Sequence, residues 1–498
     1  MKYLKVNLWG KEIGRLVWDA AAVCAYFMYN PKRPDEIPDI APLLSPAGKR
    51  NFQLPVYGDE RPLYQGLPPF IADSLPDSWG NTLFDQWIRD NKIPRNRVTP
   101  LYKLMFIGNR GMGALEYEPC AADLEHPKEI DVKSLYDLSL KIIDERERAV
   151  LDAREELTLQ ALLAVGTSAG GRQMKAVIAI DEADGTIRSG QTDGRDGDAY
   201  YILKFGNPEM PVSEIEYAYY RLAVRAGIEM EKSRLFPVGG VNHFLTRRFD
   251  RKDGRKIHVQ TLAAMYPEAG SYEELIAVCR ELSMPESTVA QLYRRMVFNV
   301  MSNNTDDHNK NFSFLLEEGG EWRLAPAYDV TFIFNLYGTG PNRDRRLSIG
   351  GKTADITKAD LLAFARRNNI RHARAIMDNV AEAIADFGRQ ADESGIRQPW
   401  RGIIQKTLDE TLAAFGYKAP AEQAEEVLSD AQGRMLEEVS IAVNSKGYYA
   451  VSAKIDGNRR RRFIRPGHPL YAEVGRLDSL FCLSGPDKVH LVEQVFPK

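Results

Sequence analysis

The segment "NTDDHNKNFSFLL", residues 304–316, constrains the fold of this chain more than any other stretch. Its acids and amides run directly into an apolar sequence with the residue types of a β-strand. A second strand is expected at "WRLA", 322–325, after a turn at 317–321, so the two would form a hairpin. Such a hairpin returns the chain to the start of its first strand and brings Asp329 beside Asn311.

Asp306 and Asn311 have the D-x-x-x-x-N spacing of a kinase catalytic loop. There the aspartate accepts the proton of the attacking hydroxyl and the asparagine holds a magnesium ion. Mg²⁺ prefers oxygen ligands that include one or two carboxylates and substrate phosphates, which Asn311, Asp329 and ATP could supply together. The alternative is a polar loop, because Asn and Asp readily hydrogen-bond their own backbone. His308 is interpreted as a brace of the loop, because Asp306 already offers a base.

A glycine-rich segment, "VGTSAGGRQMK" at 165–175, lies between an expected helix and an expected strand. Such a loop can present backbone N–H groups and hydroxyls to phosphates. It is no Walker A motif, since no Lys-Ser or Lys-Thr closes it, and a flexible loop without a ligand remains the alternative. The candidate ligand-binding residues here are Gly166, Thr167, Ser168, Gly170, Gly171 and Lys175.

Lys204 stands in the nearly apolar strand "YYILKF", 200–205. A lysine there is costly unless its ammonium finds an anion. A nucleotide phosphate is a suitable partner, as for the lysine on the third strand of kinases, which also meets a helix glutamate. Glu216 is the candidate for that glutamate, and the alternative is that it completes a capping box with Ser213.

The length of 498 residues exceeds what one hydrophobic core usually organises, so several units are expected. The order of patterns predicts an α+β, kinase-like bilobal fold, with a charged helix at about 131–164 between the first two units. The expected units are an N-terminal β-rich module (1–125), a small mixed lobe with the glycine-rich loop (126–250), a larger helical lobe with the catalytic loop (251–416), an acidic linker helix (417–435) and a β-rich C-terminal extension (436–498).

The formal net charge of −3 gives no reason to expect nonspecific binding to nucleic acids or membranes. Neither a signal peptide nor a run of about eighteen apolar residues is present, and the four cysteines lie far apart. We therefore expect a cytoplasmic protein with free thiols and no membrane partner. Arg459 to Arg462 and Arg465 in the extension could contact phosphates, but a solvated edge strand is the favoured interpretation.

Taken together, the glycine loop, strand lysine, helix glutamate, D-x-x-x-x-N loop and later aspartate follow the order found in kinases. The chain resembles the HipA-like serine/threonine kinases, toxins of bacterial toxin–antitoxin pairs, over roughly residues 3–415. The resemblance rests on the glycine loop, on "NTDDHNKNFSFLL" and on the motifs "VNLWGKEIGRLVWD", "ADSLPDSWGN", "NRGMGALEYEP" and "APAYDV".

This resemblance implies site roles. Asp306 would be the catalytic aspartate, Asn311 and Asp329 the magnesium ligands and Lys204 the ATP-phosphate lysine. Phe249 would lie where the interlobe hinge reaches adenine. Ser168 would be autophosphorylated, with Thr167 as the alternative, because the loop is one residue longer than in the form compared. His308 and Val330 depart from ordinary protein kinases, so the activation-segment control of those enzymes is not assumed.

The function implied is an ATP- and Mg²⁺-dependent serine/threonine kinase that phosphorylates a cytosolic protein, such as an aminoacyl-tRNA synthetase. Its partner would be a helix-turn-helix antitoxin of the HipB type, with operator DNA contacted mainly through that partner. Two rival hypotheses remain. One is a catalytically silent kinase-fold module that engages a DNA-binding repressor, and the other is a metal-dependent phosphohydrolase that uses Asp306, Asp307 and His308.

Overall fold

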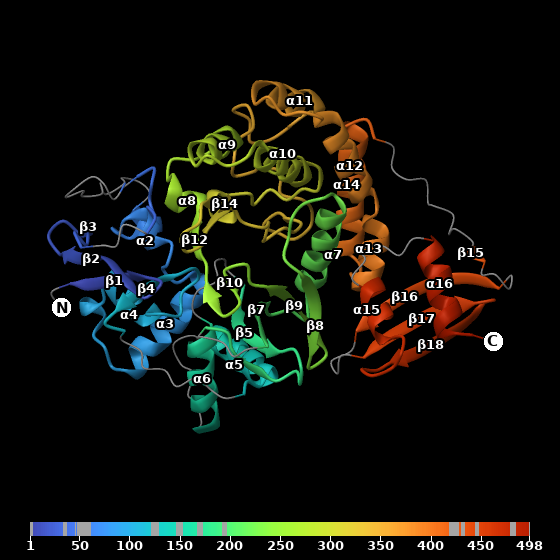
Figure 1. The fold of residues 1–498 in the computed structure, drawn as a ribbon, viewed down its shortest axis with the longest axis horizontal. Helices are drawn as coiled ribbons and strands as arrows, with labels where there is room; N and C mark the ends of the chain where they lie inside the picture. The colour runs from blue at the N-terminus through green and yellow to red at the C-terminus, as the bar shows by residue number, and fades with distance from the viewer. Residues whose placement is uncertain are drawn as a thin grey trace. The chain divides into compact units, whose positions relative to one another are not determined.

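The protein has a mixed α/β, kinase-like bilobal fold, seen in a computed structural model (Figure 1). The chain divides into two compact units, Met1–Phe415 and Gly416–Lys498. The structure describes residues 3–32, 37–44, 46, 61–120, 129–145, 153–166, 173–191, 197–417, 428–429, 434–443, 448–478 and 485–497.

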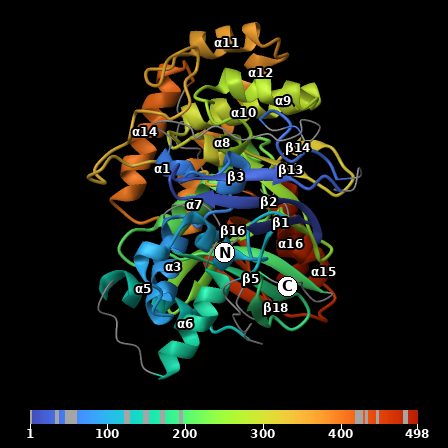
Figure 2. The same ribbon diagram turned by 90° about the vertical axis from the view of Figure 1, so that its left-hand side faces the viewer.

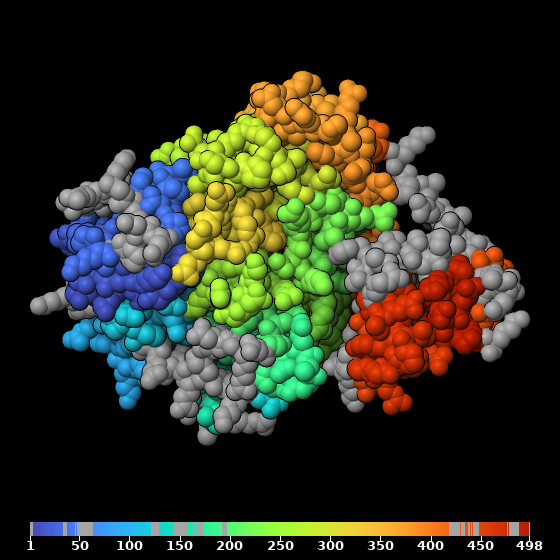
Figure 3. Space-filling model, viewed as in Figure 1, coloured from blue at the N-terminus to red at the C-terminus, as the bar shows by residue number. Residues whose placement is uncertain are grey.

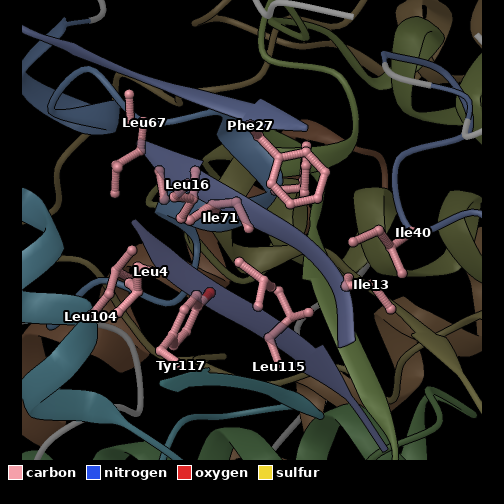
Figure 4. Packing of buried hydrophobic residues seen from close by; sticks show 14 of the residues in the cluster. Leu4, Ile13, Leu16, Phe27, Ile40, Leu67, Ile71, Leu104, Leu115 and Tyr117 are labelled. Atoms are coloured by element: carbon pink, nitrogen blue, oxygen red, sulfur yellow. The ribbon is translucent and has the colours of Figure 1, made fainter. Parts of the chain in front are cut away.

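The N-terminal module is built on an antiparallel sheet with the strand order β3-β2-β1-β4. Alternate residues of its first strands, such as Leu4 and Leu16, are fully buried and pack with Phe27, Leu104 and Tyr117 (Figure 4). A tight turn at Gly10 joins the first two strands. The elements are β1 (Leu4–Leu8), β2 (Lys11–Asp19), β3 (Cys24–Tyr29), α1 (Arg61–Tyr64), α2 (Pro69–Ala72), α3 (Ser78–Asp90), α4 (Pro100–Ile107) and β4 (Leu115–Glu118).

The small lobe contains a five-stranded sheet with the order β6-β5-β7-β9-β8. Helix α3 of the N-terminal module shares a hydrophobic core with α5, α6 and this sheet (Figure 2). The predicted single helix at about 131–164 is instead two helices, and residues 146–152 between them lie outside the described part. The elements are α5 (Val132–Glu145), α6 (Ala153–Val165), β5 (Lys175–Asp181), β6 (Ile187–Ser189), β7 (Asp198–Lys204), α7 (Val212–Arg225), β8 (Ser233–Val238) and β9 (Val241–Arg247).

The large lobe combines a small sheet, β12-β13-β14, with a set of helices. The predicted hairpin is confirmed, with Phe314 opposite Leu324. The elements are β10 (Arg251–Lys252), β11 (Arg255–Lys256), β12 (His258–Thr261), α8 (Leu262–Met265), α9 (Tyr272–Glu281), α10 (Glu286–Met301), β13 (Ser313–Leu316), β14 (Trp322–Leu324), α11 (Lys358–Arg367), α12 (Ala373–Ala385), α13 (Phe387–Ser394) and α14 (Trp400–Ala414).

The N-terminal module packs directly on the large lobe, and in Figure 3 blue residues touch yellow ones. Trp9 donates its indole N–H to the carbonyl of Lys256 at 2.9 Å. The glycine turn in "NRGMGALEYEP" also serves this packing, because the backbone N–H of Gly113 donates to the buried carboxylate of Asp250 at 2.8 Å. The turn therefore attaches the module to the connection between the two lobes.

The C-terminal unit has its own core, in which two helices pack on a sheet of order β15-β16-β17-β18. The extension is therefore not only β-rich, because apolar residues at helical spacing, such as Val474 and Leu477, bury against the strands. The elements are β15 (Leu428–Ser429), β16 (Met435–Val443), β17 (Tyr449–Ile455), β18 (Asn458–Ile464), α15 (Tyr471–Asp478) and α16 (Gly485–Val495).

The predicted linker helix over 417–435 is wrong at Leu428–Ser429, which form β15 instead. Leu428 lies opposite Leu436 in the sheet, so pairing with β16 outweighs the helical propensity of the segment. Residues 418–427 and 430–433 of this prediction lie outside the described part. The four arginines at 459–462 are exposed on β18, an edge strand, as the favoured interpretation holds. None of the described helices is both long and apolar enough to span a membrane.

Candidate active site

Three charged side chains from distant parts of the sequence meet between the two lobes. Strand β7 ends at Lys204, whose ammonium contacts Glu216 Oε1 on α7 at 2.5 Å and also contacts Asp329 Oδ1. The exposed fractions of the three side chains are 12% for Lys204, 7% for Glu216 and 28% for Asp329. The buried lysine thus finds two anions within the protein, and Asp329 is the more open of them.

Charge and burial compete at this cluster. Burial alone would lower the pKa of Lys204, but the carboxylates of Asp329 and Glu216 outweigh it and raise this pKa above its ordinary value. Burial raises the pKa of Glu216 despite the neighbouring ammonium. Burial also opposes ionisation of Asp329, yet the charge of Lys204 brings the pKa of this carboxyl below its ordinary value. The cluster therefore keeps a cation and an accessible carboxylate side by side.

Asp329 has a left-handed backbone, with a φ of 53°. Residues other than glycine rarely adopt this conformation, and it is concentrated at functional sites where the surrounding structure enforces it. The pairing of β13 with β14, which ends at Phe314 and Leu324, brings the chain back toward the D-x-x-x-x-N loop shortly before Asp329.

Asp306 lies on the exposed side of the catalytic loop, with 47% of its side chain exposed. Its carboxylate is 3.7 Å from Arg346 Nε and 3.9 Å from His308 Nε2. The side-chain amide of Asn311 donates to the backbone carbonyl of Asp306 at 2.8 Å, which ties the two ends of the D-x-x-x-x-N motif together. His308 Nδ1 accepts from the backbone N–H of Lys310 at 3.2 Å, as expected of a brace.

A cavity of about 20 Å³ is lined by Asn311, Asp329 and buried polar residues that include Asn304. This volume is enough for one water-sized group. The side-chain oxygen of Asn304 is buried and has no hydrogen-bond donor among the described residues. Polar oxygens therefore converge behind the candidate metal ligands.

Asp307, next to the candidate base, has a different environment. Its carboxylate accepts from Tyr272 OH at 2.7 Å, from Arg345 Nη1 at 2.7 Å and from the backbone N–H of Arg346 at 3.0 Å. The side chains of Asp307 and Arg345 are almost completely buried, at 0% and 4% exposure. These hydrogen bonds hold the loop in place. They disfavour the phosphohydrolase hypothesis, because that hypothesis requires Asp307 to be available for chemistry. Sequence reasoning missed Tyr272 and Arg345, because no spacing links them to the loop.

The alternative of a capping box at Glu216 is wrong. Helix α7 begins after Pro211, has no side-chain cap, and leaves the buried hydroxyl of Ser213 without a partner among the described residues. The carboxylate of Glu216 turns to Lys204 instead, because an ion pair inside the cluster compensates its burial better than a cap at the helix end.

The remaining predicted residues lie in different places. Lys175 is predicted from the sequence to bind the nucleotide. Its buried ammonium forms an ion pair with the carboxylate of Asp77 at 2.7 Å. The ring of Phe249 is half-buried and 5.7 Å from that of Tyr328, on the connection between the lobes. Gly166 packs closely against α3. Thr167, Ser168, Gly170 and Gly171 lie outside the described residues.

The arrangement suits an anionic substrate with a divalent cation. Among the described residues, no three His, Cys, Asp or Glu side chains are grouped so that they could hold a metal ion. Asn311 and Asp329 offer one amide oxygen and one carboxylate, a donor set that fits Mg²⁺ when phosphate and water oxygens complete its shell. Lys204 can neutralise phosphate charge beside them.

Two family models match the chain: the HipA N-terminal domain over residues 4–118 and the HipA-like C-terminal domain over residues 167–387. Among solved structures, this chain superposes on a protein chain from the complex of HipA, HipB and operator DNA of the Shewanella oneidensis MR-1 toxin–antitoxin system. The TM-score is 0.58 and the identity 16%, with 83% of this chain and 98% of that chain covered. This likeness shows a shared fold.

Two curated proteins, both named as candidate kinases, are similar in sequence. Y4dM of Sinorhizobium fredii is 21% identical over 374 residues, which cover 70% of this chain and 82% of that protein. A protein of Haemophilus influenzae is 31% identical over 156 residues, which cover 27% of this chain and 45% of that protein.

Proposed function

Because the chain belongs to the family of HipA-like kinases, with both the N-terminal and the C-terminal domain of that family, we propose that it transfers the γ-phosphoryl group of ATP to a serine or threonine of a protein. The observation that carries this proposal is the contact of Lys204 with Glu216 and Asp329 beside the D-x-x-x-x-N loop. A buried lysine between two carboxylates, one of them near an asparagine amide, matches the parts that phosphoryl transfer requires.

Within this proposal each residue of the site has a role. Lys204 binds and neutralises the phosphates of ATP, and Glu216 keeps the ammonium in place. Asp306, exposed on the loop, orients the acceptor hydroxyl and takes its proton. Asn311 and Asp329 hold Mg²⁺, which supplies charge stabilisation to the transferring phosphoryl group. Asp307 takes no part in the chemistry and keeps the loop in shape.

Incubation with γ-labelled ATP and Mg²⁺ tests the proposal. Wild type should label itself or an added protein, whereas Asp306→Asn should not. Asp344→Asn, a change of an exposed aspartate outside the cluster, is the matched control and should label like wild type. A wild-type protein that binds ATP but labels nothing would support the silent binding module instead, and release of phosphate without labelling would support a hydrolase.

We propose that the protein substrate is cytosolic, a translation component such as an aminoacyl-tRNA synthetase being one candidate, and that the chain also phosphorylates itself in the glycine-rich segment. Mass spectrometry of phosphopeptides, with Asp306→Asn as the control, would identify acceptors and decide between Ser168 and Thr167. A catalytically active protein without phosphate at either residue would contradict autophosphorylation there.

We also propose a helix-turn-helix antitoxin as partner, since the similar Shewanella chain comes from a complex with HipB and operator DNA. Operator DNA would be contacted mainly through that partner. Co-expression with a helix-turn-helix repressor of the HipB type and co-purification test this, and a repressor that elutes separately at micromolar concentrations would contradict it.

A further inference from the structure

The segment "ADSLPDSWGN", residues 72–81, connects α2 to α3. It contains two aspartates whose side chains contact residues outside the N-terminal module. Asp77 reaches the small lobe, where its carboxylate binds Lys175 at 2.7 Å. Asp73 reaches the large lobe, where its carboxylate accepts from Thr261. One short link of the module is therefore attached to both kinase lobes.

The attachment to the small lobe is buried and specific. Asp77 Oδ2 accepts from Lys175 Nζ, while Asp77 Oδ1 accepts from the backbone N–H of Gly80 at 2.6 Å and caps α3. The exposed fractions are 2% for Lys175 and 9% for Asp77. Trp79 adds a hydrogen bond from its indole N–H to the carbonyl of Lys175 at 3.0 Å. The first residue of β5 is therefore held by both side chain and backbone.

This attachment lies next to the nucleotide site. Lys175 pairs with Lys204 in the register of β5 and β7, so both lysines project from the same face of the sheet. On the other side of the glycine-rich segment, a Cβ at Gly166 would lie 2.3 Å from Leu83 Cδ1 and 3.3 Å from Trp79 Nε1. Gly166 and Lys175, which stand on either side of residues 167–172, therefore both contact α3.

The attachment to the large lobe leads to the catalytic loop. Asp73 accepts from Thr261 N at 2.7 Å and from Thr261 Oγ1 at 2.8 Å. Thr261 pairs with Ser313 across β12 and β13, and the hydroxyl of Ser313 is 2.6 Å from that of Tyr328. Tyr328 then donates to the carbonyl of Lys310 at 2.7 Å. Tyr328 precedes Asp329, and Lys310 precedes Asn311, so this chain of contacts ends at the residues next to the two candidate metal ligands.

We propose that residues 73–77 form a strap that sets the spacing of the two lobes around the nucleotide, with Asp77 positioning β5, which pairs with the strand of Lys204, and Asp73 positioning the D-x-x-x-x-N loop. This inference rests on the proposed kinase function. Four Cα spacings limit the distance between the Cα atoms of Asp73 and Asp77 to about 14 Å. The lobes cannot separate at this point unless the buried attachment at Asp77 or the partly buried attachment at Asp73 breaks. Both aspartates are positioning residues.

Steady-state kinetics of Asp77→Asn and Asp73→Asn test the strap. Asparagine preserves the cap at α3 but removes the charge that faces Lys175, so Asp77→Asn should raise KM for ATP about 5-fold or more with kcat within about 2-fold. Asp73→Asn should lower kcat about 10-fold with KM for ATP within about 2-fold, because it loosens the catalytic loop. Lys175→Met removes the cation of the same ion pair and should behave like Asp77→Asn.

The matched control is Asp19→Asn in the same module, because the hydrogen bonds of this carboxylate within the described part of the chain come from Ala21 and Ala22 of its own turn. Its kinetics should equal those of wild type. If Asp73→Asn and Asp77→Asn lower the melting temperature but leave both kinetic constants unchanged, the strap is only structural and the inference is overturned. Equal effects of both variants on kcat and KM would overturn the division of roles.

Calorimetric titration with Mg²⁺ and a nonhydrolysable ATP analogue separates this inference from the proposed function. In an Asp306→Asn background, the added Asp77→Asn change should weaken binding of the analogue about 5-fold, whereas added Asp73→Asn should leave it unchanged. If the analogue binds neither wild type nor Asp306→Asn, the kinase proposal itself fails. If it binds every variant equally, the proposed kinase function stands and the strap is refuted.

Discussion

The ammonium of Lys204 contacts the carboxylate of Asp329, although 125 residues separate them in the sequence. One residue ends a strand of the small lobe and the other follows a hairpin of the large lobe, so the contact spans the two halves of the candidate active site. Glu216 completes the cluster from a third element. The cluster therefore holds one ammonium between two carboxylates.

Replacement of Lys204 by methionine should both destabilise and inactivate the protein. Glu216 would be left buried and Asp329 partly buried without their cation, so the free energy of unfolding should fall by about 3 kcal/mol. Phosphoryl transfer should fall at least about 10²-fold, because the phosphate charge is no longer neutralised. Denaturant titration and labelled ATP measure the two effects. Lys204→Met with Glu216→Gln should recover part of the stability and none of the activity; unchanged stability of the single variant would refute the charge argument.

Substitution of Asp306 should mainly lower activity, whereas substitution of the adjacent Asp307 should mainly lower stability. Asp306 is half-exposed, so Asp306→Asn should change the free energy of unfolding by no more than about 0.5 kcal/mol while activity falls about 10²- to 10⁴-fold. Asp307→Asn removes the charge that faces buried Arg345 and should cost about 3–5 kcal/mol of stability. Thermal melting and the labelling assay compare them. Strong labelling by Asp306→Asn would contradict its assignment as the base.

Removal of Mg²⁺ with excess EDTA should abolish labelling, and readdition should restore it. Asn311→Ala should raise the Mg²⁺ concentration needed for half-maximal activity about 10-fold, the usual scale for loss of a metal-site contact. Asn309→Ala, on the same short turn, is the control and should keep the wild-type requirement. An unchanged requirement in Asn311→Ala would remove this residue from the metal site.

His243 should make stability depend on pH. Burial lowers the pKa of this imidazole from 6.5 to about 4, so the folded state disfavours the charged form. The unfolded chain binds the proton first, and stability is therefore complete above about pH 6.5 and declines as the pH falls to about 4. One proton contributes a slope of at most about 1.4 kcal/mol per pH unit.

His243→Asn keeps an acceptor for the backbone N–H of Gly206 and removes the titration. Its loss of stability between pH 6.5 and 4 should be shallower than that of wild type in urea titrations at several pH values. Parallel curves for the two proteins would assign the acid sensitivity to other groups, such as His258, whose pKa burial lowers to about 3.

Local sequence patterns were enough to predict several elements on which the candidate site stands. The apolar alternation of the hairpin and of β5 and β7, and the helical period of α7, depend on neighbours within a few residues. The same local reasoning left open a capping box at Ser213 and Glu216 and predicted a helix across Leu428, because it counts propensity and spacing but not what the finished fold buries.

The sequence by itself determined the D-x-x-x-x-N spacing, the hairpin that returns toward Asp329 and a lysine in an apolar strand that needed an anion. Only the tertiary structure decided the partners: Glu216 and Asp329 for Lys204, Asp77 for Lys175, and Arg345 with Tyr272 for Asp307. The physical reason is burial. A charged group removed from water must be paired, but which opposite charge it meets depends on how elements far apart in the chain pack together.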